Sequence, residues 1–449
     1  MTERGRASFI IVGGGASGVI LAAHLLRSPN AALRVTIIEK RSAFGQGLAY
    51  STYLPDHLLN VSAMGMSALA DDREHFWRWI KSNGLATEEE APVYAPRAIY
   101  GLYLQELLTQ LYDREPDRLR LVQEEAIWVA PTSAGVDVRL ANGTNILGHV
   151  AVLAAGHDEE PAPEQRYAIR IGSNDDTLID PESRVLILGS GLSMVDAWLT
   201  LEHRGHRGEI VALSRRGLLP SPHRQGRPIL LDSADIPLGT ELSYFFRWFR
   251  NLIRATEAAG GNWRDAVDGL RPFNQLIWQS WPVSAKRRFL EHTKAWWDIH
   301  RHRMAPEIYA RLSEAIGSGR LRLLAGRVLD VHKAKEGFEV DIQRRPAQQV
   351  ECLRVSRIYD CTGIVKDVST GAIAIVRSLT DRRLARPDSL RLGIDVTKDC
   401  AVIDADGVAS ATLFAIGPLT RGTFFEIDAV PDIRKQCASL AERLTNQSS

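Results

Sequence analysis

Cysteine is scarce in this sequence. The 449 residues include only four cysteines, and none of them belongs to a C-x-x-C pair. Neither a disulfide framework nor a redox-active dithiol is therefore indicated, and the composition fits a reducing compartment. We accordingly expect a cytoplasmic protein. The four cysteines are Cys352, Cys361, Cys400 and Cys437.

Long apolar runs are lacking as well. The sequence has no uninterrupted stretch of about 18 or more apolar residues, the length that a membrane-spanning helix needs. The apolar segment from Phe9 to Leu26 is interrupted at Gly13 to Gly15, and no small-residue cleavage site closes it. It is therefore interpreted as the start of the fold and not as a signal peptide.

An excess of charge of either sign is also absent. Fifty-five basic side chains stand against 54 acidic ones, so the formal charge is +1 and no general field favours nucleic acid or an anionic membrane. Small-molecule partners are therefore expected, with no nucleic acid and no membrane. A chain of 449 residues exceeds what one hydrophobic core usually fills, so two or three domains are expected.

Residue patterns that perform chemistry without a cofactor are missing. The sequence shows no nucleophilic triad, no paired carboxylates at meaningful spacing and no P-loop. The pairs His203/His206 and His300/His302 do not have the arrangement of a zinc site, so we interpret them as solvated or capping histidines and expect no metal. The chemistry is therefore expected to come from a bound cofactor.

The N-terminal segment carries a dinucleotide-binding pattern. Ser8–Val12 is typical of a buried strand and Ala16–Leu26 of a helix. The turn between them reads G-x-G-x-x-G and comprises Gly13, Gly14, Gly15, Ala16, Ser17 and Gly18. The first glycine makes the tight turn, the second lets the backbone approach a pyrophosphate, and the third lets helix and strand touch. The phosphates would lie at the helix N-terminus, where unpaired N–H groups favour negative charge.

A second predicted strand, Arg34–Ile38, ends in Glu39. This carboxylate lies about 20 residues beyond Gly18, where it can accept hydrogen bonds from a ribose diol. Strand, glycines, helix, strand and acid in this order indicate a dinucleotide site, and a coincidental glycine turn is the weaker interpretation. The pattern does not by itself separate FAD from NAD.

The pattern recurs further along the chain. Arg184–Leu188 is a predicted strand, followed by Gly189, Ser190, Gly191, Leu192 and Ser193 and then by a helix through Leu201. Met194 replaces the third glycine, but the first two glycines contact the phosphates. The alternative is a Rossmann-like repeat that binds nothing.

The strand after this second turn, Glu209–Leu213, ends in Ser214, Arg215, Arg216 and Gly217 instead of an acid. An acid would favour NAD through the ribose 2′-hydroxyl, whereas arginines can pair with a 2′-phosphate in bidentate fashion. We therefore predict NADPH, with a solvated basic turn as the alternative. The predicted NADP contacts are Gly189, Gly191, Leu192, Ser193, Ser214, Arg215 and Arg216.

Two later segments resemble those of the flavoproteins with two dinucleotide-binding domains, the superfamily of disulfide reductases and flavin monooxygenases. They are the strand His149–Leu153 entering Ala154-Ala155-Gly156-His157, and the strand Ala411–Gly417. The resemblance implies FAD in the first site, with Gly417 near the ribityl chain and pyrophosphate. The superfamily usually has an Asp after that glycine, but Pro418 stands here, so backbone groups of Gly417 and Thr423 are the expected substitutes.

A set of short strings resembles a narrower family, the bacterial FAD/NAD(P)-binding proteins. The strings are Gly47-Leu-Ala-Tyr50, His57-Leu-Leu-Asn-Val61, Ala95-Pro-Arg97 with Tyr100-Gly101, Gly191-Leu-Ser-Met-Val-Asp196, Ser214-Arg-Arg-Gly217 with Pro220 and His223, and Gly417-Pro-Leu-Thr-Arg-Gly-Thr423. Some relatives are similar to flavin-dependent N-hydroxylating monooxygenases. The resemblance implies FAD contacts at Gly13, Gly14, Gly15, Ala16, Ser17, Gly18, Glu39, Lys40, Gly47, Asn60, Met64, Ala126, Ala155, Gly156, Gly417, Thr423 and Phe424.

Asn60 resembles the asparagine that flavin monooxygenases place at the isoalloxazine, where it hydrogen-bonds a C4a-(hydro)peroxyflavin. An amide can donate to this adduct without supplying an acid that would expel peroxide. The alternative for Asn60 is an ordinary turn residue. We name Asn60, His223 and Arg301 as candidate catalytic residues. His223 follows a proline-stiffened loop, and Arg301 belongs to a polar group with Asp298 and Arg303.

Residues 226–319 break the rhythm of strands and glycines and indicate an all-helical insertion containing six of the ten tryptophans. Ser284–Arg303 predicts one amphipathic helix with Phe289, Thr293, Trp296, Trp297 and His300 on one stripe. Pro306 ends it or opens the next helix. The insertion could be a lid with Trp278 and Trp281 facing substrate. Core packing is the preferred interpretation of these tryptophans.

Together these observations predict an α/β protein with two Rossmann-like domains, the glutathione-reductase-like FAD/NAD(P) fold, and a helical insertion in the second. The predicted boundaries are 1–170 and 366–449 for the FAD domain and 175–365 for the NAD(P) domain. The predicted function is that of an NADPH-reduced, FAD-dependent monooxygenase that uses O₂ on a small nucleophilic substrate such as an amine or amino acid nitrogen. The alternatives are a flavoprotein dehydrogenase or reductase without oxygen insertion, and a flavin-bound redox sensor or scaffold.

Overall fold

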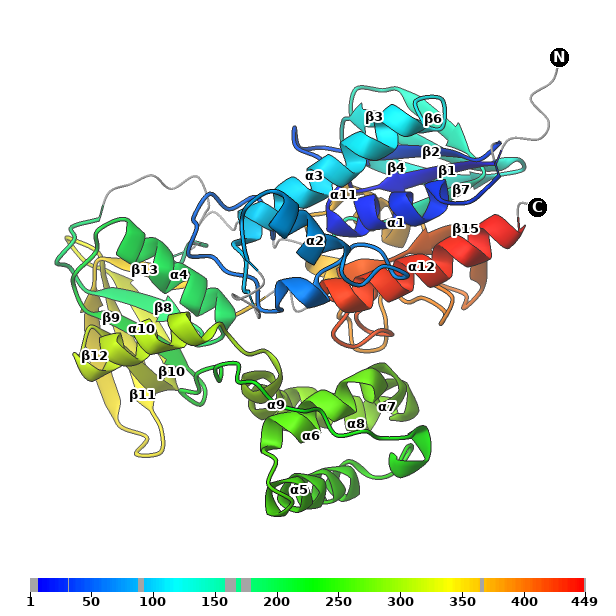
Figure 1. Cartoon of the computed structure of the whole chain (residues 1–449). Helices are drawn as coiled ribbons and strands as arrows, with labels where there is room; N and C mark the ends of the chain where they lie inside the picture. Colours follow the sequence, from blue (N-terminus) through cyan, green and yellow to red (C-terminus); the bar gives the residue numbers. More distant parts are fainter. Residues whose placement is uncertain are drawn as a thin grey trace. The chain divides into compact units, whose positions relative to one another are not determined.

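The computed structural model describes residues 7–30, 32–87, 93–157, 167–170, 179–363 and 367–447. The chain forms two compact units (Figure 1). The first unit comprises Met1–Pro161, Asn274–Gln279 and Ile364–Ser449, and the second comprises Ala162–Phe273 and Ser280–Gly363. A short piece from the middle of the chain therefore belongs to the unit built from both ends.

The first unit is organised around a six-stranded sheet with the order β14-β15-β7-β1-β2-β3. Its strands are β1 (Ser8–Val12), β2 (Arg34–Glu39), β3 (Leu119–Gln123), β7 (Val150–Leu153), β14 (Ala401–Ile403) and β15 (Ala409–Ala415). All neighbouring strands are parallel except the pair β14 and β15. The carboxyl ends of β1, β2, β7 and β15 therefore meet at one edge, where α/β folds bind their ligands.

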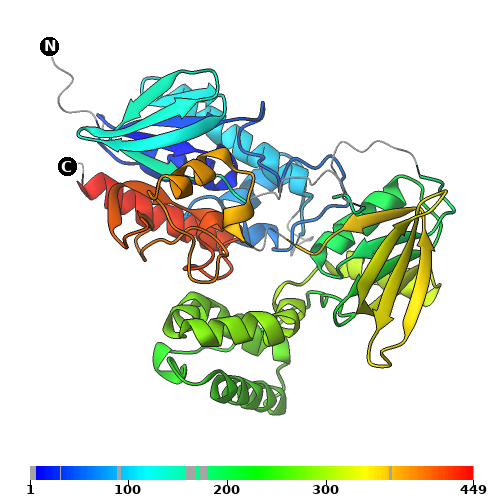
Figure 2. The ribbon, with the colours of Figure 1, turned by 180° about the vertical axis from the view of Figure 1, so that it is seen from behind.

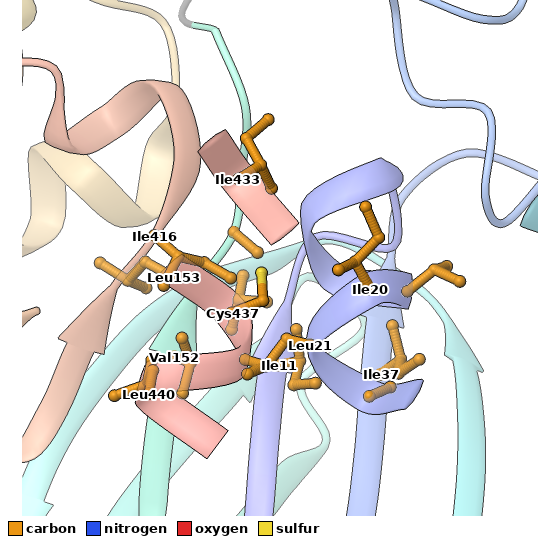
Figure 3. Packing of buried hydrophobic residues seen from close by; sticks show 14 of the residues in the cluster. Ile11, Ile20, Leu21, Ile37, Val152, Leu153, Ile416, Ile433, Cys437 and Leu440 are labelled. Atoms are coloured by element: carbon orange, nitrogen blue, oxygen red, sulfur yellow. The ribbon is translucent and has the colours of Figure 1, made fainter. Parts of the chain in front are cut away.

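Helices cover one face of this sheet. They are α1 (Ala16–Leu26), α3 (Arg97–Arg114) and α12 (Val430–Gln447), with α2 (His75–Ser82) and the short η1 (Ala63–Gly65) in the connection before α3. Figure 3 shows α1 and α12 side by side, with Leu21 and Cys437 directed toward the strand residue Ile11. Because β1 and α1 are buried along most of their lengths, the first glycine turn is held by a continuous core.

A three-stranded antiparallel sheet lies on the opposite face, as the view from behind shows (Figure 2). It consists of β4 (Ala126–Thr132), β5 (Gly135–Leu140) and β6 (Asn145–Gly148). Residues of β5 contact β7 and β15, and α11 (Ala374–Asp381) packs on β4. The parallel sheet is thus covered on both sides, as its apolar strands require.

The second unit repeats the plan with a sheet of order β12-β11-β10-β9-β8-β13. Its strands are β8 (Val185–Leu188), β9 (Ile210–Ser214), β10 (Leu321–Lys333), β11 (Phe338–Arg344), β12 (Val350–Val355) and β13 (Arg357–Asp360). The first half of β10 pairs in parallel with β9, and its second half pairs with β11 in antiparallel fashion. Helices α4 (Leu192–His203) and α10 (Pro306–Gly317) lie on one face of this sheet (Figure 1).

The segment between β9 and β10 is helical, apart from the loop that opens it. Its elements are η3 (Ser233–Asp235), α5 (Leu242–Ala258), α6 (Trp263–Leu270), η4 (Arg271–Phe273), α7 (Asn274–Ser280), α8 (Val283–Arg288), η5 (Phe289–Thr293) and α9 (Lys294–Arg301), and α10 follows. Pro306 is the first residue of α10, so it opens a helix. Trp278 and Trp281 are 1% and 5% exposed, which agrees with core packing.

The prediction of one helix with a single apolar stripe over Ser284–Arg303 is wrong in its register. Phe289–Thr293 adopts a π-helix, which shifts the following residues around the helix axis. Trp297 and Arg301 therefore turn inward, whereas Trp296 is 46% exposed. No sequence periodicity of 3.6 residues can anticipate such a shift.

The interpretation of His206 as a solvated or capping histidine is also wrong, because the residue is 3% exposed and neither ring nitrogen has a hydrogen-bond partner among the described residues. Burial lowers the pKa of His206 below its ordinary value of 6.5. Burial likewise lowers the pKa values of His24 in α1 and His75 in α2. A lowered pKa means that the unfolded chain binds protons more readily than the folded protein does.

The folded protein is consequently expected to lose stability on acidification. The histidine contribution is fully present above pH 6.5, the unfolded value, and is lost as the pH falls through the folded pKa values. Thermal unfolding followed by circular dichroism at pH 7.5 and at about pH 5.5 measures this loss. The profile of His206→Gln should be flatter than that of the wild type, and a wild-type midpoint that rises on acidification would contradict the assignment.

Candidate functional site

The first glycine turn has a geometry that only glycine permits. Gly13 has a φ of +111°, and a Cβ atom placed on it would lie 2.4 Å from the carbonyl oxygen of Ala154. Its N–H donates to the carbonyl of Ile38 over 2.8 Å. The turn therefore lies between the ends of β7 and β2, and Gly13 occupies the position that the motif gives to the glycine of the tight turn.

Helix α1 begins with an open N-terminus at this turn. Gly15 is its N-cap residue, makes no side-chain capping hydrogen bond and has no acidic residue in the turn that follows. A Cβ on Gly15 would lie 3.4 Å from the Cα of Gly47, so the two glycines face each other. A Cβ on Gly18 would lie 2.0 Å from the carbonyl oxygen of Gly13. The backbone is thus bare where a diphosphate would approach the helix dipole.

Glu39 lies directly beside the turn. Its Oε2 accepts from the N–H of Gly14 over 2.8 Å, its Oε1 accepts from the N–H of Arg41 over 2.9 Å, and the residue is 9% exposed. Because each carboxylate oxygen has a second lone pair, the oriented group can still accept from a ribose diol. Lys40 Nζ lies 3.9 Å from Glu125 Oε1, which brings Lys40 to the residue before Ala126. The predicted FAD contacts Glu39, Lys40 and Ala126 are therefore neighbours.

The C-terminal segment also reaches this turn. Gly417 has a φ of +67°, and a Cβ on it would lie 2.6 Å from Ser17 Oγ in the first turn of α1. The N–H of Gly417 donates to Gln436 Oε1 over 2.7 Å, and the N–H of Thr423 donates to the carbonyl of Thr420 over 3.0 Å. The N–H groups of Gly417 and Thr423, which we expected to replace an aspartate, both have acceptors within the protein. The contribution of Gly417 is therefore that its missing side chain lets a ligand approach the backbone closely.

The remaining predicted FAD contacts lie on the same unit. Asn60 is partly buried just before η1, in which Met64 is 44% exposed. Ala155 and Gly156 follow β7, and a Cβ on Gly156 would meet no atom within 4 Å. Phe424 is 7% exposed in the loop after Gly417. The structure thus gathers Gly13 to Gly18, Glu39, Gly47 and Gly417 at one turn, and the other candidates belong to the same unit.

The second glycine turn reproduces the first in detail. Gly189 also has a φ of +111°, a Cβ on it would lie 2.2 Å from the carbonyl oxygen of Cys361, and its N–H donates to the carbonyl of Leu213 over 2.8 Å. Gly191 is the N-cap of α4, ahead of Leu192 and Ser193, and a Cβ on it would meet no atom within 4 Å. The phosphate-approach side of this turn is therefore open as well.

The polar turn after β9 is internally ordered. Ser190 Oγ donates to Ser214 Oγ over 2.8 Å, and Ser214 Oγ accepts from the N–H of Gly217 over 2.9 Å. Arg215 is exposed. The guanidinium of Arg216, in contrast, donates to the carbonyl of His292 over 2.8 Å and lies 5.5 Å from the ring centre of Trp296. Arg215 is therefore better suited than Arg216 to receive a 2′-phosphate.

The candidate residues His223 and Arg301 lie on neighbouring segments of the second unit. Ser221 and His223 donate backbone hydrogen bonds to Ile299 and Met304, so the loop after β9 runs beside the end of α9. His223 is partly buried and Arg301 is 9% exposed. Asn60 belongs to the first unit. Among the described residues, no group of three His, Cys, Asp or Glu side chains could hold a metal ion.

Two residues that surround the first turn were missed in the sequence. Phe44 and Gly45 contact Gly14. The N–H of Gly45 donates to the carbonyl of Gly14 over 2.7 Å, and a Cβ on Gly14 would lie 2.7 Å from Phe44 Cδ1. The positive φ of Gly45, +90°, is the local reason for glycine there. The available signal was the glycine-rich run after Glu39, but its partner across the turn could not be known from sequence.

The residues present fit a dinucleotide in each turn, because each combines a bare glycine backbone with an uncapped helix N-terminus. Residues 10–158 match a family model described as FAD-NAD(P)-binding. This segment is therefore similar to the FAD-NAD(P)-binding family. No curated protein sequence matches the chain.

Solved structures resemble the whole chain and not only its FAD-NAD(P)-binding segment. An ornithine N-hydroxylase from Kutzneria sp. 744, with reduced FAD, NADP⁺ and L-ornithine, is 14% identical with a TM-score of 0.64, over 99% of this chain and 100% of that one. A cadaverine monooxygenase from Erwinia amylovora bound to FAD is 16% identical with a TM-score of 0.68, over 98% and 94%.

A bacillithiol disulfide reductase from Staphylococcus aureus is 11% identical with a TM-score of 0.55, over 99% of this chain and 100% of that one. At such identities these likenesses concern the fold. They confirm the predicted α/β fold of flavoproteins with two dinucleotide-binding domains. None of the described helices is both long and apolar enough to cross a membrane.

Proposed function

We propose that this chain is an FAD-dependent oxidoreductase that is reduced by NADPH and transfers an oxygen atom from O₂ to a small nucleophilic substrate. The single observation that carries the proposal is the duplication of the glycine turn in one chain. Gly13 and Gly189 share the same φ, and each donates its N–H to the end of the next strand over 2.8 Å. Two such turns suit a flavin and a nicotinamide nucleotide in one molecule.

The first turn is assigned to FAD and the second to NADPH. The first lies in the FAD-NAD(P)-binding segment and ends in the acid Glu39, which would orient the adenosine ribose. The second is followed by Arg215 and Arg216 instead of an acid, which favours a 2′-phosphate. FAD bound in the first site would accept a hydride from NADPH and, once reduced, would react with O₂.

The chain's own residues would bind and orient these groups. The N-termini of α1 and α4 would hold the two diphosphates through backbone N–H groups. The amide of Asn60 would donate a hydrogen bond beside the flavin ring without offering an acidic proton. His223 and Arg301 are proposed as donors on the substrate side, where Arg301 would attract an anionic group.

Oxygen transfer to nitrogen is favoured by the kinds of protein that share the fold. Two of them, an ornithine N-hydroxylase and a cadaverine monooxygenase, act on amines. The reductase with a similar fold suggests electron transfer without oxygen insertion. This second function is less favoured, because the four cysteines of the present chain include no C-x-x-C pair.

One experiment distinguishes these functions. The purified protein is expected to be yellow, to oxidise NADPH faster when a suitable amine is added, and to incorporate isotope-labelled oxygen from O₂ into that amine, as read by mass spectrometry. NADPH oxidation that is stimulated by a disulfide or quinone, with no label in any amine, would replace the oxygenase by the reductase. A colourless protein that takes up no FAD would remove both.

The variant Asn60→Ala tests the proposed role of the Asn60 amide beside the flavin. Without the amide, the ratio of released hydrogen peroxide to oxidised NADPH should rise by about tenfold, while the rate of flavin reduction stays within about twofold, since a hydrogen bond to a charged group contributes about 1.5 kcal/mol or more. An unchanged ratio would assign Asn60 to the turn alone.

A further inference from the structure

Helix α7 is part of the helical insertion in sequence, but it packs as part of the first unit. The indole Nε1 of Trp278 donates to the carbonyl of Gly422 over 2.8 Å, and its ring stacks on Phe425 with centres 4.7 Å apart and planes at 17°. Asn274 Nδ2 donates to Glu426 Oε2 over 2.9 Å. These contacts join residues about 150 positions apart in the chain.

The groups that make these hydrogen bonds are withdrawn from water. Trp278 is 1% exposed, and Asn274 and Glu426 are each 8% exposed. A buried carbonyl or carboxylate oxygen that lost this donor would keep its desolvation cost without the hydrogen bond that offsets it. Removing the donor therefore costs more than the net stabilisation of one hydrogen bond. Glu426 has a φ of +59°, a conformation that a side chain larger than glycine adopts only when its surroundings enforce it. Helix α7 supplies part of those surroundings.

The segment that α7 holds, Gly417–Ala429, is called the C-terminal loop below. Its start lies at the first turn of α1, because a Cβ on Gly417 would lie 2.6 Å from Ser17 Oγ. Its end lies beside the residue after Gly156, because Asp428 Oδ1 is 3.5 Å from His157 Nε2. The loop therefore connects the first glycine turn to the end of β7, across the edge of the sheet where FAD is proposed to bind.

We propose that α7 is a positioning element of the FAD site: Trp278 and Asn274 hold the C-terminal loop in the shape that receives FAD. The inference rests on the proposed FAD site. Because FAD and α7 contact the same loop, binding of one stabilises the shape that the other requires, and the coupling is reciprocal. Trp278 and Asn274 act through the loop and touch no reacting atom.

The coupling also links the cofactor to the helical insertion. Helix α7 is covalently continuous with η4 before it and with α8 after it. A change in the conformation of the C-terminal loop would therefore be transmitted through α7 to the segments on either side of it in the chain. The tryptophans of the insertion then have more than one role: Trp278 packs within the first unit, whereas Trp297 packs against Phe249 within the second.

The test compares FAD affinity in three full-length variants freed of cofactor and titrated with FAD, with quenching of flavin fluorescence as the readout. Trp278→Phe keeps an aromatic ring but removes the donor to Gly422, and Asn274→Ala removes the donor to Glu426. Each is expected to raise the Kd for FAD by about tenfold, the equivalent of one buried hydrogen bond. Trp297→Phe, the matched control in the second unit, should leave the Kd within about twofold of the wild-type value.

Hydrogen exchange of residues 274–280 supplies the reciprocal measurement. FAD added to the wild-type apoprotein should slow exchange in this segment, and it should do so less in Trp278→Phe. A purely structural role of α7 would lower the unfolding midpoint without changing either readout. Unchanged FAD affinity in both α7 variants, or exchange in α7 that does not respond to FAD, would overturn the inference while leaving the proposed function intact. A wild-type protein that binds no FAD would overturn both.

Discussion

Gly18→Ala is expected to destabilise the protein by about 3 kcal/mol and to weaken FAD binding by roughly a hundredfold. Gly18 lies inside α1, where alanine is the better helix former by about 1 kcal/mol. The expected loss therefore has to come from contact. A Cβ at this position would lie 2.0 Å from the carbonyl oxygen of Gly13 and 3.3 Å from Ile11 Cγ2.

The two effects have one cause. To accommodate the methyl group, α1 must move away from β1 and from the turn. Its N-terminal N–H groups then no longer point toward the diphosphate. Two hydrogen bonds to a charged group, at about 1.5 kcal/mol each, account for roughly a hundredfold in affinity. The measurements are the free energy of unfolding of the apoprotein and the Kd for FAD.

Gly317→Ala is the matched control. Gly317 ends α10, and a Cβ on it would meet no atom within 4 Å. Alanine there should leave FAD affinity unchanged and should stabilise the protein by up to about 1 kcal/mol. If Gly18→Ala behaved like Gly317→Ala, the close approach of α1 to its turn would not be a requirement of the site.

Comparison of the two turns separates the structural reason for the first glycine of the motif from the reason for the third. Gly189 corresponds to Gly13 in φ, in its hydrogen bond and in the carbonyl that would block a Cβ. The third position differs, because Met194 is fully buried where Gly18 would admit no side chain. The first glycine is thus required by the passage from strand to helix between two neighbouring strands. The third depends on how closely the helix approaches the turn.

The parts of the fold that follow from local chemistry were predictable. The sequence predicts a strand at Ser8–Val12 and a helix at Ala16–Leu26, and the structure has both at the same bounds. A buried parallel strand reads as an unbroken apolar run, and glycine marks its end, so neither needs information from distant residues. For the same reason the strand predicted at Arg184–Leu188 is present as β8 (Val185–Leu188).

The parts that depend on distant contacts were not predictable. Helix α7 carries no local sign that Trp278 meets Gly422, since the pairing is decided by how the chain returns to the first unit. The π-helix at Phe289–Thr293 changes which tryptophan is buried, and its cause lies in packing. At the site, glycines and Glu39 could be named from the motif, but Phe44 and Gln436 reach it only through the tertiary fold.

Arg215→Glu is expected to lower kcat/KM for NADPH by roughly a hundredfold while changing kcat/KM for NADH by no more than about threefold. The variant removes two charge-assisted hydrogen bonds to a 2′-phosphate and places a like charge beside it. Arg216→Ala should have a smaller effect, about threefold, because the Arg216 guanidinium already donates to the carbonyl of His292 and lies over Trp296. The rate of flavin reduction by each nucleotide in anaerobic stopped flow measures these ratios.

Arg204→Glu separates this specific pairing from a general change of charge. Arg204 is exposed and follows the C-terminal end of α4, a helix of 12 residues whose N-terminus carries the second glycine turn. At a rise of about 1.5 Å per residue this places it roughly 18 Å from the turn, beyond the Debye length at physiological salt. Its reversal should leave both nucleotides unaffected. Equal losses with NADPH and NADH in Arg215→Glu would mean that Arg215 supports the turn and does not read the 2′-phosphate, and the preference for NADPH would then have no residue to explain it.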